Sequence, residues 1–109
     1  MSFNVIATPD FNREVKPLVK KYPSLKTELL ELSDLLAKNP KQGESLGADA
    51  YKIRIAIKSK GKGKSGGGRI ITNVVVEETS VFLISIYDKS AQASISKEEI
   101  KQRIKSLKK

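Results

Sequence analysis

The sequence contains neither cysteine nor histidine among its 109 residues. Without cysteine there can be no disulfide and no thiolate zinc site, which fits a reducing compartment. Without histidine there can be no Ser-His or Cys-His pair, no two-histidine ribonuclease centre and no histidine-ligated metal. Acid–base chemistry must therefore come from Lys, Tyr, Asp or Glu, with Arg as a fixed cation.

A long apolar run is also lacking. No stretch approaches the roughly 18 residues that a membrane-spanning helix needs. The N-terminal residues Met-Ser-Phe-Asn-Val have no basic segment of the kind that opens a secretory signal. We therefore expect a cytoplasmic protein without a membrane partner, folded as one domain over residues 1–109.

Acidic residues are few: 12 Asp and Glu stand against 21 Lys and Arg, which gives a net charge of +9. An excess of this size predicts an anionic partner, nucleic acid first. The excess is also clustered, because no acidic residue occurs from Tyr51 to Val76. A solvated lysine-rich loop is the plainer interpretation of such a run. Lys52 and Arg54 weaken it, since both alternate with apolar residues in a predicted strand.

The N-terminal part predicts a strand at residues 3–7 followed by a helical hairpin. Thr8 is a candidate N-cap, and Pro9 suits the first helical turn. A second helix is expected to begin at residues 23–24 and to end at Asn39. The apolar stripes of the two helices are Phe11, Val15, Leu18 and Val19, then Leu25, Leu29, Leu32 and Leu36.

The remainder predicts three strands and a helix. Expected in order are a loop at 41–50, a strand at 51–58, a Gly/Lys loop at 59–68, strands at 69–76 and 80–87, and a helix opened by a capping box at 96–99. The predicted fold class is α+β, with the order β-α-α-β-β-β-α: an antiparallel sheet with an N-terminal helical hairpin and a C-terminal helix, its helices on one face.

Antiparallel pairing in the last hairpin predicts which side chains share a face. The expected cross-strand pairs are Arg69–Tyr87, Ile71–Ser85 and Asn73–Leu83. The expected core face holds Ile70, Thr72, Val74 and Val76 against Phe82, Ile84 and Ile86. Arg69, Asn73, Ser85 and Tyr87 are then expected on the side away from the core, with Lys89 continuing past the strand.

The basic side chains of this region suit RNA. Arg holds phosphate with a planar fork, Lys acts as a point charge, and Tyr can stack on a base or donate a proton. The candidate RNA-binding residues are Lys58, Lys60, Lys62, Lys64 and Asn73. No metal ligand set and no cofactor are expected.

Three segments carry a family resemblance: YKIRI at 51–55, KSKGKGKSGGGRII at 58–71 and FLISIYDKS at 82–90. They resemble RelE/HigB-like toxins of bacterial type II toxin–antitoxin pairs, within the RelE/ParE superfamily, and the similarity extends over nearly the whole chain. The resemblance implies a RelE-like fold and a ribosome-dependent endoribonuclease that cuts mRNA and so inhibits translation. In that family a Lys/Arg cluster, without metal, promotes attack of the ribose 2′-hydroxyl and leaves a 2′,3′-cyclic phosphate.

Carried over by position, the resemblance implies catalytic roles for five residues. Lys52 and Arg54 match the family's general base and charge stabiliser, and Arg69 matches its phosphate-binding arginine. Lys89 falls where a basic residue stands near the leaving oxygen, and Tyr87 is a further candidate acid. The implied partners are mRNA on the ribosome, a cognate antitoxin from an adjacent gene, and operator DNA through the antitoxin complex.

Two other functions fit the residues alone. The first is a non-catalytic basic module that binds RNA or DNA, and the second is an interaction protein with an acidic partner. The spacing Gly61-x-Gly63-x-x-Gly66 matches a dinucleotide fingerprint, but a strand follows it instead of the required helix.

Overall fold

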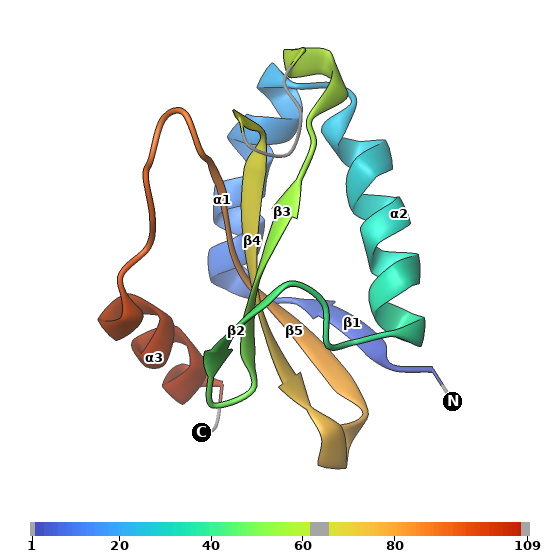
Figure 1. Ribbon diagram of the computed structural model, residues 1–109, viewed down its shortest axis with the longest axis vertical. Coiled ribbons are helices and arrows are strands. Elements are labelled where there is room, and N and C mark those ends of the chain that lie inside the picture. The colour runs from blue at the N-terminus through green and yellow to red at the C-terminus, as the bar shows by residue number, and fades with distance from the viewer. Residues whose placement is uncertain (1, 62–65, 108–109) are drawn as a thin grey trace.

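The N-terminal strand and helical hairpin form as predicted. In the computed structural model, which describes residues 2–61 and 66–107, β1 (Asn4–Ala7) leads into α1 (Pro9–Lys21) and α2 (Leu25–Lys38) (Figure 1). α1 begins where expected because the Thr8 side-chain oxygen accepts a hydrogen bond from the Phe11 amide at 3.2 Å. None of the helices in the described parts of the chain is both long and apolar enough to cross a bilayer.

The α+β fold class is confirmed, and the sheet differs from the expected one in two details. Five strands pair in the order β1-β5-β4-β3-β2: the other four are β2 (Glu44–Gly47), β3 (Ala50–Ile55), β4 (Gly68–Val75) and β5 (Ser80–Asp88). β1 runs parallel to β5, so the sheet is mixed rather than antiparallel. No tight turn joins β1 to its partner, so nothing in the connection requires an antiparallel pair.

The second difference is β2, which lies within the predicted loop at 41–50. Ala48 and Asp49 both adopt positive φ, 52° and 61°. Two such residues form the turn whose twist matches paired antiparallel strands. The chain therefore folds back as a hairpin, with Glu44 opposite Lys52.

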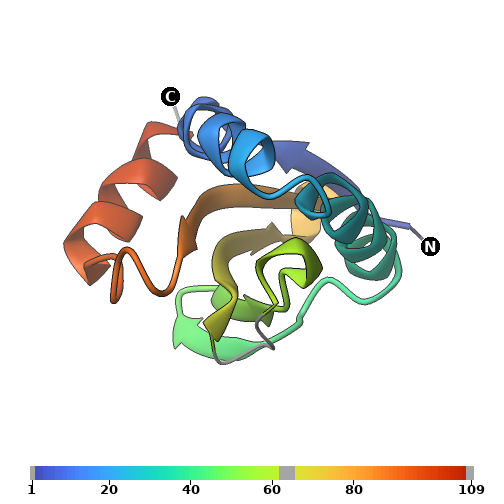
Figure 2. The same cartoon turned by 90° about the horizontal axis from the view of Figure 1, so that it is seen from above.

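Helices cover both faces of the sheet. α1 and α2 lie side by side on one side, and α3 (Lys97–Ser106) packs on the other face and meets α1 at its edge (Figure 2). The larger core lies under α1 and α2 and includes Leu25, Leu36, Ile53, Ile55, Ile57, Ile70, Val74, Val81 and Ile86. On the other face, Ile100 of α3 packs with Ile71 and Ile84. β4 is consequently buried from Gly68 to Val74.

This second layer overturns the expected exposed face of the last hairpin. Arg69, Asn73, Ser85 and Tyr87 lie away from the larger core, but their exposures are only 5%, 4%, 1% and 5%. The C-terminal helix forms as predicted, but the expectation that all helices lie on one face of the sheet is wrong, because α3 packs against Ile71 and Ile84 on the other face.

The expected register holds for half of the hairpin. Arg69 pairs with Tyr87 and Ile71 with Ser85, as predicted, but Asn73 pairs with Phe82 instead of Leu83. The register shifts after Ile71, where a β-bulge leaves Ile84 as an extra residue in β5. Ile84 and Phe82, expected in the main core, therefore pack with α3.

Arg103 ties α3 to the rest of the fold. Its guanidinium makes two 2.9 Å hydrogen bonds to Glu14 of α1, one to Glu99 at 2.9 Å and one to the Ile84 carbonyl at 3.2 Å. The hydrogen bonds to Glu14 hold the pKa of Arg103 above its ordinary value, against the opposing effect of burial. The bulge and the C-terminal helix are thus held by the same charged group.

Two glycines give a matched stability test. Gly43 and Gly47 share a φ of +87°, but a Cβ at Gly43 would lie 2.3 Å from the Lys52 carbonyl oxygen, whereas a Cβ at Gly47 meets nothing within 4 Å. Gly47→Ala should cost about 1 kcal/mol of unfolding free energy through backbone strain alone. Gly43→Ala should cost about 3 kcal/mol or more, because β3 must also move. Urea denaturation measures both, and equal losses would contradict the close approach.

Candidate functional site

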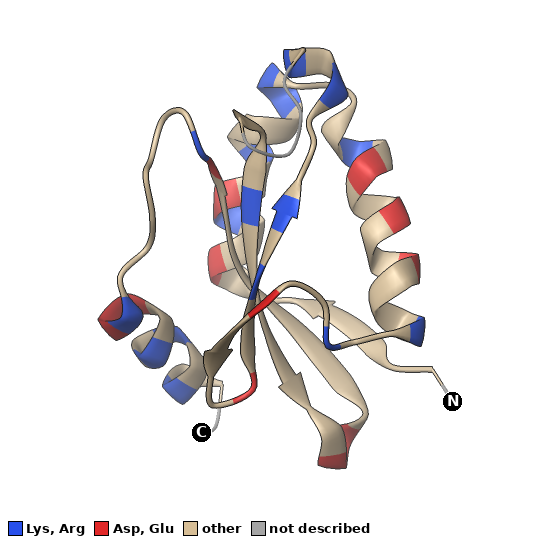
Figure 3. Ribbon diagram, viewed as in Figure 1, with Lys and Arg blue, Asp and Glu red and all other residues tan. Residues whose placement is uncertain are grey.

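The sheet register brings three predicted site residues into one row. Arg54 of β3 lies opposite Arg69 of β4, which lies opposite Tyr87 of β5. Figure 3 shows basic positions of β3 and β4 side by side. We call Arg54, Arg69 and Tyr87 the arginine row. It runs inward from the surface, because Arg54 is exposed whereas Arg69 and Tyr87 are buried.

The electrostatics of the row suit an anion. Like charges directly opposite on neighbouring strands repel each other. The Arg69 guanidinium donates to the Gly68 carbonyl at 3.0 Å, which fixes one end of the fork. Burial raises the pKa of the Tyr87 phenol, and the positive charge of Arg69 offsets only part of that rise. Tyr87 therefore keeps its proton at neutral pH and can donate it.

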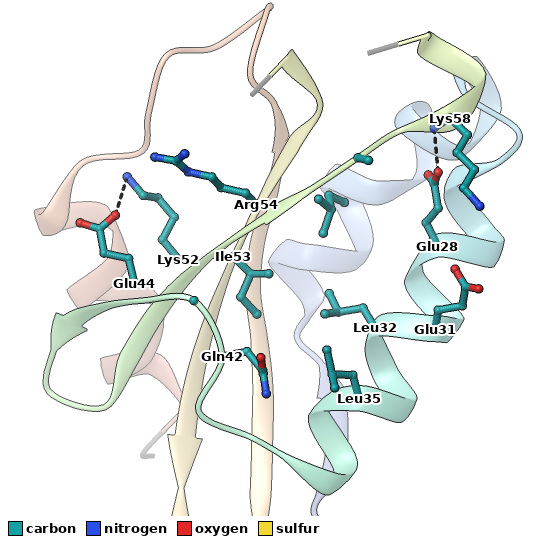
Figure 4. Close-up of a pocket in the computed structure, with 13 residues that line it drawn as sticks. Glu28, Glu31, Leu32, Leu35, Gln42, Glu44, Lys52, Ile53, Arg54 and Lys58 are labelled. Atoms are coloured by element: carbon teal, nitrogen blue, oxygen red, sulfur yellow. Dashed lines mark hydrogen bonds and ion pairs between the residues drawn. The ribbon is translucent and has the colours of Figure 1, made fainter. Parts of the chain in front are cut away.

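Lys52 lies beside the row, two residues from Arg54 on β3. In Figure 4 the Lys52 and Arg54 side chains point away from α2, whereas Ile53 points toward it. The Lys52 amine lies 3.6 Å from a carboxylate oxygen of Glu44, whose side chain is 62% exposed. An ion pair so open to solvent is weak, so an incoming phosphate can displace the carboxylate.

Glu44 was missed because residues 41–50 were expected to form a loop. The signal was present: an apolar Leu46 precedes Gly-Ala-Asp at 47–49, a composition typical of a hairpin turn. The segment from Tyr51 to Val76 contains no acidic residue, but in the folded protein the Glu44 carboxylate lies beside it.

Lys89 lies just beyond β5, close to the inner end of the row. Its backbone N–H donates to the Gly67 carbonyl at 3.0 Å, and its amine donates to the Ala93 carbonyl at 3.2 Å. The predicted catalytic residues Lys52, Arg54, Arg69 and Tyr87 are therefore grouped on one face, with Lys89 at its border.

The predicted RNA-binding residues are not grouped in this way. Lys58 lies on the α2 side of β3, where its backbone N–H donates to Glu28 at 2.7 Å (Figure 4). Asn73 lies four residues beyond Arg69 on β4 and is buried. Its amide donates to the carbonyls of Ala48 and Asp49, both at 3.3 Å. Lys62 and Lys64 lie outside the described residues.

Lys60 is engaged inside the protein. Its amine forms an ion pair with Asp88 and donates to the Ser90 hydroxyl at 2.7 Å and to the Gly66 carbonyl at 3.0 Å. The Tyr22 hydroxyl donates to the other oxygen of Asp88 at 2.8 Å. Nothing in the sequence pointed to this cluster, because its members are far apart along the chain.

A groove of about 560 Å³ runs between α2 and β3. Its floor includes Leu32, Leu35 and Ile53, and Glu28 and Glu31 line its helical wall (Figure 4). Lys52 and Arg54 also line this groove, but their charged ends point away from α2 (Figure 4). In the described part of the chain, no three Asp or Glu side chains gather as a metal site.

Comparison with known proteins identifies both a family and a fold. A family model described as the RelE toxin of the RelE/RelB toxin–antitoxin system matches residues 9–109. A mutant of the E. coli toxin RelE in the free state is 21% identical with a TM-score of 0.63, over 98% of this chain and 99% of that one. The toxin–antitoxin complexes RelBE of E. coli (23% identity, TM-score 0.56, 80% of this chain and 96% of that one) and RelBE2 of Mycobacterium tuberculosis (17%, 0.55, 81% and 99%) are also similar. The predicted RelE-like fold is confirmed.

The perturbed phenol of the row gives a spectroscopic prediction. One phenol of the parent protein should titrate above the ordinary pKa of 10.0. This titration should be absent from Tyr87→Phe and present in the control Tyr51→Phe. Because its folded pKa is raised, the stability that Tyr87 contributes is present below pH ~10 and is lost as pH rises through the folded value. Phenolate absorbance measures the titration. If Tyr87→Phe and Tyr51→Phe remove indistinguishable phenols, the burial effect is refuted.

Proposed function

This chain belongs to the RelE family of toxins, and we propose that it is a ribosome-dependent endoribonuclease that inhibits translation by cutting mRNA. The observation that carries this proposal is the arginine row. Two arginines on adjacent strands, next to a phenol that keeps its proton, form a site for one phosphate.

The repulsion between the two arginines favours a bound phosphate. Like charges directly opposite on neighbouring strands repel each other, so Arg54 and Arg69 concentrate positive charge at one place on the sheet. A phosphate would turn that repulsion into two attractions and accept hydrogen bonds from both guanidinium forks. RNA offers such a phosphate at every nucleotide.

The proposed reaction divides among the residues of this face. Lys52 takes the proton of the ribose 2′-hydroxyl, whose oxygen forms a bond to the adjacent phosphorus. Arg54 and Arg69 stabilise the extra negative charge of the pentacovalent phosphorane. As the bond from phosphorus to the 5′-oxygen breaks, Tyr87 or Lys89 supplies a proton to that oxygen. The products are a 2′,3′-cyclic phosphate and a 5′-hydroxyl.

The chemistry of the product ends tests this mechanism. On preassembled ribosome complexes, the new 5′ ends should accept labelled phosphate from polynucleotide kinase without prior phosphatase treatment. Arg54→Ala should slow cleavage roughly 30- to 1,000-fold, equivalent to about 2–4 kcal/mol of transition-state stabilisation. Arg54 is preferred to Arg69 because it is exposed, so its loss leaves the core intact.

Exposed Lys38, at the end of α2, provides the control, since Lys38→Ala removes one positive charge far from the row. Products with 5′-phosphate ends would refute attack by the 2′-hydroxyl. Tight RNA binding without any cleavage would support a non-catalytic RNA-binding module instead.

We further propose a cognate antitoxin as the protein partner. Two of the similar structures are toxin–antitoxin complexes, and a basic protein of this kind needs an acidic mask among cellular RNAs. The antitoxin would either wrap the sheet or take the place of α3 against Ile71 and Ile84. Tight complexes of this type commonly bury about 2,000 Å² or more.

Arg103 distinguishes these two modes of binding. Arg103→Met removes the bonds that hold α3 to Glu14, whereas the control Arg13→Met removes only an exposed pair with Asp10. If the antitoxin replaces α3, Arg103→Met should tighten its binding, because less must be displaced. Calorimetry with the co-expressed neighbouring gene product measures this. A neighbour that neither co-purifies nor relieves growth arrest refutes the partner.

A further inference from the structure

Lys60 and Asp88 form a buried polar cluster that the proposed reaction does not use. Only 10% of the Lys60 side chain and 5% of the Asp88 side chain are exposed. The Lys60 amine also lies 5.7 Å from the centre of the Tyr22 ring. Burial alone would raise the pKa of Asp88, but hydrogen bonds from Lys60, Tyr22 and Ser90 outweigh it and hold that pKa below its ordinary value.

The Lys60 amine of this cluster also binds the backbone at Gly66, where the chain approaches β4. Three successive carbonyls, those of Gly66, Gly67 and Gly68, each accept a bond from a positively charged residue. Gly66 accepts from the Lys60 amine, Gly67 from the Lys89 backbone N–H, and Gly68 from the Arg69 guanidinium. We call Gly66–Gly68 the glycine strip.

The glycine strip connects Lys60 to the arginine row. At one end it is held by the Lys60–Asp88 pair, and at the other it holds the fork of Arg69. Side-chain packing also restrains it, since a Cβ at Gly68 would lie 3.3 Å from the side chain of Ile55. In a strip held at both ends, a displacement of Gly66 would be passed to the Gly68 carbonyl, which accepts a hydrogen bond from Arg69.

We propose that Lys60, paired with Asp88, is a positioning residue that sets the Arg69 guanidinium through the glycine strip and does not itself contact RNA phosphate. The part concerning RNA rests on the proposed function. The part concerning Arg69 is a property of the free protein.

Two alternatives make different predictions. If Lys60 contacted phosphate directly, releasing it from Asp88 would strengthen RNA binding, because one more cation would face the backbone. If the pair served only the stability of the fold, its loss would reduce the fraction of folded protein without changing the site in the molecules that remain folded.

The first experiment measures the Tyr87 phenol in the free protein, using Asp88→Ala. This variant makes the neighbourhood more positive, which by charge alone lowers the Tyr87 pKa. Displacement of Arg69 removes the charge that now opposes the burial effect, so it raises the Tyr87 pKa. We expect the rise in Asp88→Ala and in Lys60→Met, and no change in the control Lys38→Met. An unchanged or lowered value in Asp88→Ala overturns the proposal.

The second experiment measures the dissociation constant of a short single-stranded RNA across a range of salt concentrations. Lys60→Met should weaken binding about tenfold, as expected for a misplaced contact, yet keep the parent's salt slope. Loss of a direct phosphate contact would flatten that log–log slope by about 0.7. A flatter slope, or tighter binding by Asp88→Ala, overturns the proposal.

Folding is monitored in parallel by near-UV circular dichroism, and constants are expressed per folded molecule. Should Asp88→Ala not fold, Lys60→Arg provides the second variant, because it can retain the pair with Asp88 and should recover part of the Lys60→Met loss. If the parent neither binds nor cleaves RNA, the proposed function fails, while the Tyr87 titration still decides whether Lys60 positions Arg69.

Discussion

The burial of β4 on both faces is the constraint on which the rest of the structure depends. From Gly68 to Val74 every residue of this strand is buried: α1 and α2 cover one face, and on the other face α3 packs against Ile71. Every polar side chain on β4 must then find an internal partner or remain unsatisfied. Asn73 finds one in the β2–β3 turn, which it holds through two backbone carbonyls. Thr72 does not: within the described structure its hydroxyl has no hydrogen-bond partner.

Arg69 shows what the same constraint means for a charged residue. A buried guanidinium is costly to desolvate, and here it also lies opposite a second arginine. Backbone carbonyl contact restrains its geometry, and a bound phosphate would neutralise its charge. Under the proposed function, the site would be preorganised for an anion before any substrate arrives, which is how electrostatic stabilisation of a transition state avoids reorganisation at the moment of reaction. Arg54, at the outer end of the row, is exposed.

Much of this arrangement could be predicted from local patterns. The Thr8 cap, the leucine stripe of α2 and the pairing of Arg69 with Tyr87 follow from side-chain chemistry, helical period and hairpin geometry. The bulge at Ile84 could not be predicted, because an extra residue in one strand leaves the alternation on either side intact. Nor could the pair formed by Lys60 and Asp88, since no rule of sequence spacing relates residues joined only by the fold.

The sequence by itself limited the chemistry of this protein: a chain without histidine or cysteine can draw acid–base groups only from Lys, Tyr, Asp or Glu, and its excess of cations favours an anionic partner. Only the tertiary structure decided which of those cations are available. It placed Arg54, Arg69 and Tyr87 in one row, turned Lys58 toward α2 and enclosed Lys60 against Asp88. The physical reason is that charge is a property of composition, whereas exposure and partners depend on which distant segments pack together.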